Sequence, residues 1–162
     1  LCFNLRRSSM STIVGTNIEV TNIKFDSDTT SMIISNAGQV TIQGEGTATT
    51  NLQQGLCKSW IDFKGTSTAS TNDSFNVSSL TDLDTGKFRV TFTNDMSSGD
   101  YTICGSAFYS QGGGFNDTMV VSRDTTQTQT ASVSPFYLYR LSSSEAIADA
   151  QEAHILYHGD LA

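Results

Sequence analysis

The sequence predicts an all-β protein, with an N-terminal β arm followed by an antiparallel, jelly-roll-like β-sandwich, and three observations support this fold class. The 162 residues include 22 serines, 22 threonines, nine phenylalanines and five tyrosines, and threonine and aromatic side chains suit pleated, half-buried surfaces. Apolar residues alternate with polar ones over short runs, which is the spacing of a strand. Asn, Asp and Gly separate these runs, as expected for turns.

Residues 1–10 form a first segment that is basic and differs in composition from the rest of the chain. The segment lacks the apolar stretch of about 7–15 residues that a signal peptide requires. We interpret Met10 as the natural start and residues 1–9 as an upstream extension of the reading frame. The alternative interpretation is a capping or docking arm.

Residues 11–56 are expected to form the β arm, because they contain short apolar runs that end in turn residues. A few strands with two or three apolar side chains each are marginal in water, since the surface they bury does not offset the entropy that the chain loses. We therefore expect the arm to intertwine with other copies of itself. The residues expected at this interface are Ile18, Val20, Val40 and Ile42.

The segment that follows the arm has two parts. Residues 51–56 fit either one helical turn or a linker, and residues 57–64 fit a strand. In that strand Ile61 and Phe63 share one face and Trp60 lies on the other. Trp60 therefore indicates a second buried surface, which we assign to contact between subunits. The alternative is an ordinary half-exposed tryptophan.

Residues 57–162 are expected to form the β-sandwich head. In the clearest strand, residues 87–93, Phe88, Val90 and Phe92 alternate with polar residues. Residues 82–86 read as a hairpin loop, and residues 144–151 have helical propensity that we limit to one short turn. The other strands are predicted over residues 74–78, 101–108, 117–123, 131–141 and 152–158.

Composition excludes several classes of protein. A net charge of −7 opposes binding to nucleic acid, which depends on clustered Lys and Arg. The apolar runs are a few residues long, whereas a membrane-spanning helix needs about 20, so no membrane insertion is expected. Cys2, Cys57 and Cys104 have neither disulfide-framework nor zinc-site spacing, and we interpret them as reduced thiols.

Catalytic chemistry is poorly represented, and we predict neither an enzyme nor a cofactor. His154 and His158 would share the outward face of one strand, with Glu152 and Asp160 nearby as conceivable further ligands. To hold a metal ion, this pair of histidines would want a third ligand and an ordered surrounding shell. We therefore interpret the two histidines as surface residues and predict no metal site. The alternative is that the histidines of three subunits gather around a trimer axis and hold an ion there.

A glycine-rich segment at residues 112–114 is flanked by residues that suit a carbohydrate. Flat aromatic faces contact the CH edges of a sugar, and amide groups bond its hydroxyls. The candidate ligand-binding residues are Tyr109, Gln111, Phe115 and Asn116. The alternative is a hairpin tip without a ligand.

Residues 58–96, KSWIDFKGTSTASTNDSFNVSSLTDLDTGKFRVTFTNDM, followed by Tyr101, resemble a domain of tail fibre or fibre-like virion proteins in tailed phages, particularly those of marine bacteria and cyanobacteria. Sequences of that family typically contain AKAWVNFNGTGT and then DSFNVSSVTDNGTGDYTVNFTTAM. The upstream segment VTIQGEGTATTNLQQGL and the terminal HGDLA are also similar to the family, which supplies no catalytic motif.

The resemblance implies a homotrimer located in the virion, on the tail or the capsid surface. Its arm would face other virion structural proteins, and its head would attach to a host-surface polysaccharide. The alternative function is a capsid-decorating or connector protein that binds no glycan. An enzyme that cleaves capsular polysaccharide is disfavoured, because such an enzyme generally uses two carboxylates at a defined separation.

Overall fold

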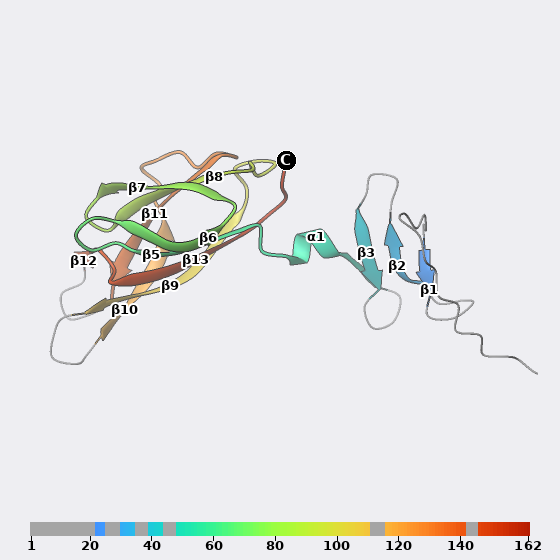
Figure 1. The fold of residues 1–162 in the computed structure, drawn as a ribbon, viewed down its shortest axis with the longest axis horizontal. Coiled ribbons are helices and arrows are strands. Elements are labelled where there is room, and N and C mark those ends of the chain that lie inside the picture. The colour runs from blue at the N-terminus through green and yellow to red at the C-terminus, as the bar shows by residue number, and fades with distance from the viewer. Residues whose placement is uncertain (1–21, 25–29, 35–38, 44–47, 111–115, 142–145) are drawn as a thin grey trace, which may run out of the picture. The chain divides into compact units, whose positions relative to one another are not determined.

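A computed structural model describes residues 22–24, 30–34, 39–43, 48–110, 116–141 and 146–162, with residues 22–24, 30, 31 and 116 described by their backbone alone. The chain divides into two compact units, residues 1–49 and residues 50–162. Both units are built from β-sheet, so the all-β prediction is confirmed (Figure 1). In the part of the chain that the structure describes, there is no helix of the length and apolar character needed to cross a membrane.

The first sheet has four strands in the order β1-β2-β3-β4. Their bounds are β1 Asn22–Lys24, β2 Thr30–Ile34, β3 Val40–Gln43 and β4 Thr49–Asn51. β2 is antiparallel to both β1 and β3. None of the side chains described in residues 1–49 is buried.

The second sheet has nine strands, which pair in the order β6-β5-β13-β9-β10-β11-β8-β7, with β12 beside β11. Every pairing is antiparallel. The bounds are β5 Ser59–Lys64, β6 Ser70–Phe75, β7 Val77–Asp84, β8 Lys87–Phe92, β9 Thr102–Ser110, β10 Asn116–Arg123, β11 Val133–Arg140, β12 Ala146–Ile147 and β13 Glu152–His158. β6 and β7 stand at opposite ends of this order, yet Asn76 alone separates them in the chain. The sheet therefore curls until its two ends nearly meet (Figure 1).

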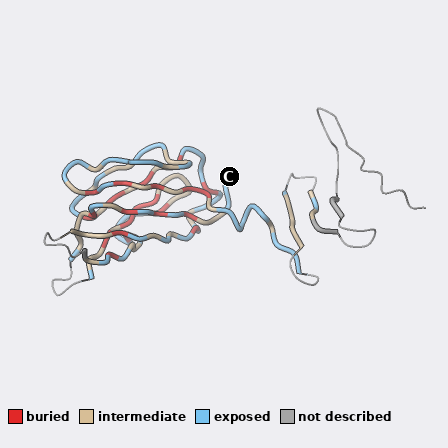
Figure 2. The backbone as a smooth tube through the Cα atoms, turned by 60° about the horizontal axis from the view of Figure 1, so that its bottom comes forward, coloured by how far each residue is buried: buried red, intermediate tan, exposed pale blue. Residues whose placement is uncertain are grey.

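The core of the second unit lies inside this curled sheet (Figure 2). Strand alternation fills it, because every second residue of β8 and β13 is buried and the residues between them face outward. Phe63 packs edge-on against Phe88 with ring centroids 5.0 Å apart, and Phe92 packs in the same way against Tyr157 at 5.1 Å. The predicted inward positions of residues 87–93 are therefore confirmed.

Asn76 turns the chain from β6 into β7, and the predicted strand over residues 74–78 is wrong at this residue. The φ angle of Asn76 is +57°, a left-handed conformation that Asn tolerates better than most residues. Its amide nitrogen donates to the carbonyls of Lys58 and Asn94, both at 3.1 Å. Its amide oxygen accepts from the backbone nitrogen of Asn94 at 2.7 Å. These hydrogen bonds hold the corner at which the two ends of the sheet meet.

Two segments with helical propensity have different outcomes. Leu52–Gly55 forms one helical turn, α1, and Asn51 caps it by accepting a hydrogen bond from the backbone of Gln53 at 2.9 Å. The helical turn predicted within residues 144–151 is wrong where the structure describes it, because Ala146–Ile147 forms β12 and pairs with β11. Residues 144 and 145 lie outside the described residues. Tertiary pairing has overridden a weak local preference there.

The hairpin predicted over residues 82–86 is confirmed, although its loop is shorter than expected. β7 runs to Asp84 and β8 begins at Lys87, so Thr85 and Gly86 alone make the turn. Gly86 has a φ angle of +63°, and a Cβ atom there would lie 2.6 Å from the backbone nitrogen of Ala148. The Gly86 nitrogen also donates to the Asp149 carboxylate at 2.6 Å. The turn therefore packs tightly on the segment that carries β12.

Candidate functional site

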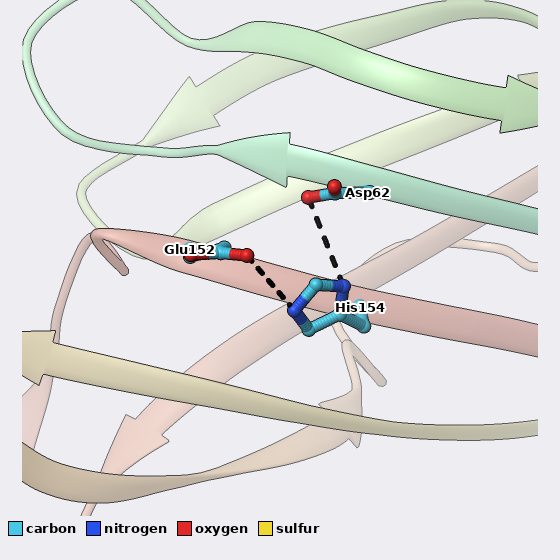
Figure 3. A group of neighbouring side chains, drawn as sticks. All are labelled: Asp62, Glu152 and His154. Carbon is cyan, nitrogen blue, oxygen red and sulfur yellow. Dashed lines mark ion pairs between the residues drawn. The ribbon is translucent and has the colours of Figure 1, made fainter.

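The outer face of β5 and β13 carries a cluster of two carboxylates and one imidazole, from Asp62, Glu152 and His154 (Figure 3). Nε2 of His154 lies 3.2 Å from Oε1 of Glu152, and Nδ1 lies 3.7 Å from Oδ1 of Asp62. Each ring nitrogen thus faces a different carboxylate. The side chains are partly open to water, with exposed fractions of 48% for His154, 42% for Glu152 and 28% for Asp62.

Strand register creates this cluster. His154 on β13 pairs directly with Asp62 on β5, and paired residues of an antiparallel sheet lie on the same face. Glu152 stands two residues before His154 and therefore shares that face. Ala153 and Ile155 are buried in the core, which forces their polar neighbours outward. The prediction that His154 faces away from Ala153 and Ile155 is confirmed.

A β-bulge on the edge strand β6 adds an amide to the cluster. Asp62 pairs with Asp73, whereas the next residue of β5, Phe63, pairs with Thr71, so Asn72 is the extra residue on β6. Bulges redirect side chains, often beside functional sites. Here Nδ2 of Asn72 donates to Oδ1 of Asp62 at 3.1 Å. The Asp62 carboxylate is therefore oriented from outside the two strands that carry the cluster.

The donor atoms of these three side chains all lie within 4.8 Å of one another. Imidazole nitrogen and carboxylate oxygen are ligands for divalent metal ions. In the absence of an ion the same three groups can form ion pairs when His154 is protonated. The two carboxylates therefore suit a positive charge between them. That charge is either a metal ion that His154 also ligates or the protonated ring of His154 itself.

An apolar row crosses the same outer face next to the cluster. Trp60 pairs with Phe75 on one side and with Leu156 on the other, and Leu156 pairs with Cys104. Phe75 is 53% exposed and Leu156 is 38% exposed. Trp60 is half-buried on this face, so its predicted position opposite Ile61 and Phe63 is confirmed. Its assignment to a subunit contact stays a prediction.

Two polar hollows lie elsewhere on the second unit. The larger has a volume of about 460 Å³ and is lined by Gln54, Ser97, Ser98, Asp100, His158, Gly159 and Asp160. The smaller has a volume of about 280 Å³ and is lined by Gly99, Asp100, Tyr101, Ile103, Val121, Arg123 and Gln129. His158 and Asp160 thus line a hollow that contains neither His154 nor Glu152, and the histidine pair noted in the sequence is divided between two places.

Tyr101 at the smaller hollow is largely withdrawn from water. Its hydroxyl donates to the carbonyl of Val133 at 2.7 Å, and the carbonyl of Thr130 lies 3.2 Å away. Burial raises the pKa of Tyr101 to about 12, because the phenolate would lose its hydration. Gln129 beside it is buried and donates to the carbonyl of Gly99 at 2.7 Å. Both side chains therefore serve to hold the walls of the hollow.

The predicted ligand-binding residues are only partly described. Tyr109 is half-buried near the end of β9, and the guanidinium of Arg140 lies 4.8 Å from the centre of its ring. Arg140 is also paired with Asp117 at 3.6 Å. Asn116 begins β10 opposite Ser110. Gln111 and Phe115 lie outside the described residues, so the proposed grouping of these side chains stays a prediction.

The predicted interface residues of the arm are also partly described. Val40 and Ile42 lie on β3, where they pair with Ile34 and Met32 of β2. All four side chains are half-buried. Ile18 and Val20 lie outside the described residues.

The sequence indicates Glu152 and His154 as possible ligands, but it does not indicate Asp62 as their neighbour. The only signal in the sequence was that Asp62 alternates with Ile61 and Phe63 and so faces outward. That pattern does not show which strand lies alongside β5.

The thiols of Cys57 and Cys104 are free, which agrees with the interpretation of these residues as reduced cysteines. Cys2 lies outside the described residues.

Comparison of the chain with protein-family models, curated proteins and solved structures gives no match.

Proposed function

We propose that this chain is a fibre-like structural protein of a tailed-phage virion, which forms a homotrimer and attaches to a host-surface polysaccharide. The N-terminal unit would be an intertwined arm that contacts other virion proteins. The second unit would be the β-sandwich head that meets the host. The resemblance of residues 58–96 to phage fibre domains supports the class of protein, and the surface of the first sheet supports the assembly.

One observation carries the assembly part of the proposal. Met32 and Ile34 pair with Ile42 and Val40, so four apolar side chains share one face of the first sheet. None of them is buried by the chain itself. Full burial of one such side chain stabilises a protein by about 1.5–3 kcal/mol. A face of this kind gains that stability when other copies of the chain cover it.

The first prediction concerns the oligomeric state. The full chain is expected to have three times the mass of its 17.4 kDa protomer, as measured by light scattering after size-exclusion chromatography. Ile42→Asp should dissociate the trimer, because it places a charge on the shared apolar face. Thr41→Asp is the matched control, since Thr41 lies between Val40 and Ile42 and faces the other side of β3. A monomeric wild-type chain at micromolar concentration would contradict the assembly.

Attachment is tested separately with purified host-surface polysaccharide. Linked weak sites gain a factor of about 10² to 10⁴ in avidity, so the trimer should bind far more tightly than the Ile42→Asp protein. A trimer that shows no affinity for any host polysaccharide would instead support a capsid-decorating or connector role. The two measurements thus distinguish the assembly from the attachment.

A further inference from the structure

We propose that the outer face of the second unit binds one divalent transition-metal ion of the zinc class between Nε2 of His154 and Oε1 of Glu152. Asp62 would not ligate the ion but would accept a hydrogen bond from Nδ1 of His154. This site is independent of the proposed virion function. It rests on the placement of three side chains by neighbouring strands.

The separation of the two donor atoms fits a shared metal ion. Zinc bonds to nitrogen and oxygen ligands are each about 2.1 Å long, so two ligands at 90° to 110° are about 3.0 to 3.4 Å apart. Nε2 of His154 and Oε1 of Glu152 are 3.2 Å apart. Both atoms can therefore bind one ion with little movement of either side chain.

Asp62 occupies the position of an orienting group. Metal-bound histidines usually donate their other ring N–H to a carboxylate, which fixes the tautomer and raises the basicity of the ligating nitrogen. Oδ1 of Asp62 lies 3.7 Å from Nδ1 of His154, whereas Glu152 faces the other ring nitrogen, Nε2. The amide of Asn72 holds the same oxygen at 3.1 Å. The proposed hydrogen bond requires Nδ1 and Oδ1 to approach more closely than this 3.7 Å when the ion binds.

The donors stand on a regular part of the sheet. β13 lies between β5 and β9, and His154 is paired on both sides, with Asp62 and with Ser106. Sites carried by strands are held more precisely than sites carried by loops. The two donor residues would therefore be held in position by the sheet before the ion binds.

The donor set selects the class of metal. Calcium and magnesium prefer shells made of oxygen alone, whereas imidazole suits zinc, copper and nickel. Nearly half of the His154 side chain and of the Glu152 side chain is exposed. Water would complete the coordination, so the site should bind zinc more weakly than a structural site with four protein ligands.

The experiment is a titration of the full chain with Zn²⁺ alone. Calorimetry measures the stoichiometry and affinity, and ¹⁵N NMR of the histidine side chains shows which ring nitrogen binds the metal. We expect one ion per chain, with the metal on Nε2 of His154 and the proton on Nδ1. Asp62→Asn should weaken zinc binding by about 10- to 100-fold. His154→Ala and Glu152→Gln should each remove this ion.

Two control variants make the result specific. His158→Ala removes the other histidine, and Cys104→Ser removes the exposed thiol that lies on β9 beside Leu156. Both proteins should bind zinc as the wild type does. The proposal is overturned if the ¹⁵N shifts of His154 do not respond to Zn²⁺, or if zinc binding is lost in either control and kept in His154→Ala.

Discussion

Single residues fix the geometry of this fold at its corners. Asn76 combines a left-handed backbone with side-chain hydrogen bonds to residues on both sides of the closure, Lys58 and Asn94. Ser67 has a similar φ angle of +63° but is exposed and lies in a loop. Substitutions at these two residues can therefore be compared to distinguish the energetic effect of the left-handed backbone from the contribution of the Asn76 hydrogen bonds to stability.

Asn76→Ala is expected to lower the free energy of unfolding by about 1–3 kcal/mol. The partly buried groups that lose their hydrogen-bond partners account for this cost, and Ala also tolerates the left-handed backbone less well than Asn. Asn76→Gly removes the same hydrogen bonds but accepts the left-handed backbone freely, so it should destabilise the protein less than Asn76→Ala. Ser67→Ala is the control and should change stability by less than about 1 kcal/mol. Urea denaturation measures all three, and equal losses at the two sites would show that the Asn76 hydrogen bonds contribute nothing.

At the scale of elements, the β7–β8 hairpin and the segment around β12 stabilise each other. The Gly86 turn packs against Ala148 and bonds to Asp149, while the backbone of Leu138 on β11 donates to the Gly86 carbonyl at 2.8 Å. β12 has two residues, too few to persist as a strand without such contacts. Local propensity in residues 146–151 therefore yields to the sheet.

Gly86→Ala should destabilise the protein by more than about 2 kcal/mol, because a Cβ there is both strained and in contact with the Ala148 backbone. Gly55→Ala is the matched control. A Cβ at Gly55, the last residue of α1, would meet nothing within 4 Å. That substitution should be neutral or stabilise the protein by up to about 1 kcal/mol. Thermal melts compare the two, and similar melting temperatures would refute the close packing inferred at Gly86.

At the scale of the whole second unit, a cluster of aromatic rings joins β8 to β13 inside the curled sheet. Tyr101 packs edge-on against Phe92 and Tyr157, at 5.5 Å and 6.1 Å between ring centroids. Burial raises the pKa of Tyr101 to about 12 and also raises the pKa of Tyr157. The folded state therefore holds these protons more tightly than the unfolded chain, whose tyrosines ionise near pH 10.

Stability is accordingly expected to be complete below about pH 10 and to fall as the pH rises from about 10 toward 12. The ultraviolet absorbance of phenolate reports the ionisation. Subtracting the titration curve of Tyr101→Phe from that of the wild type should leave a component centred near pH 12. A difference curve centred near pH 10 would mean that Tyr101 is accessible to water in the folded protein.

Side-chain alternation is a local property of a strand, so the amino-acid order was enough to predict the all-β class, the inward positions of β8 and β13, and the outward positions of Trp60 and His154. Tertiary structure alone decided that Asp62 lies beside His154, that Ala146–Ile147 pairs with β11, and that the sheet turns at Asn76. These features depend on which distant strands become neighbours. Strand order follows from the packing of the whole core, and a local pattern does not contain it.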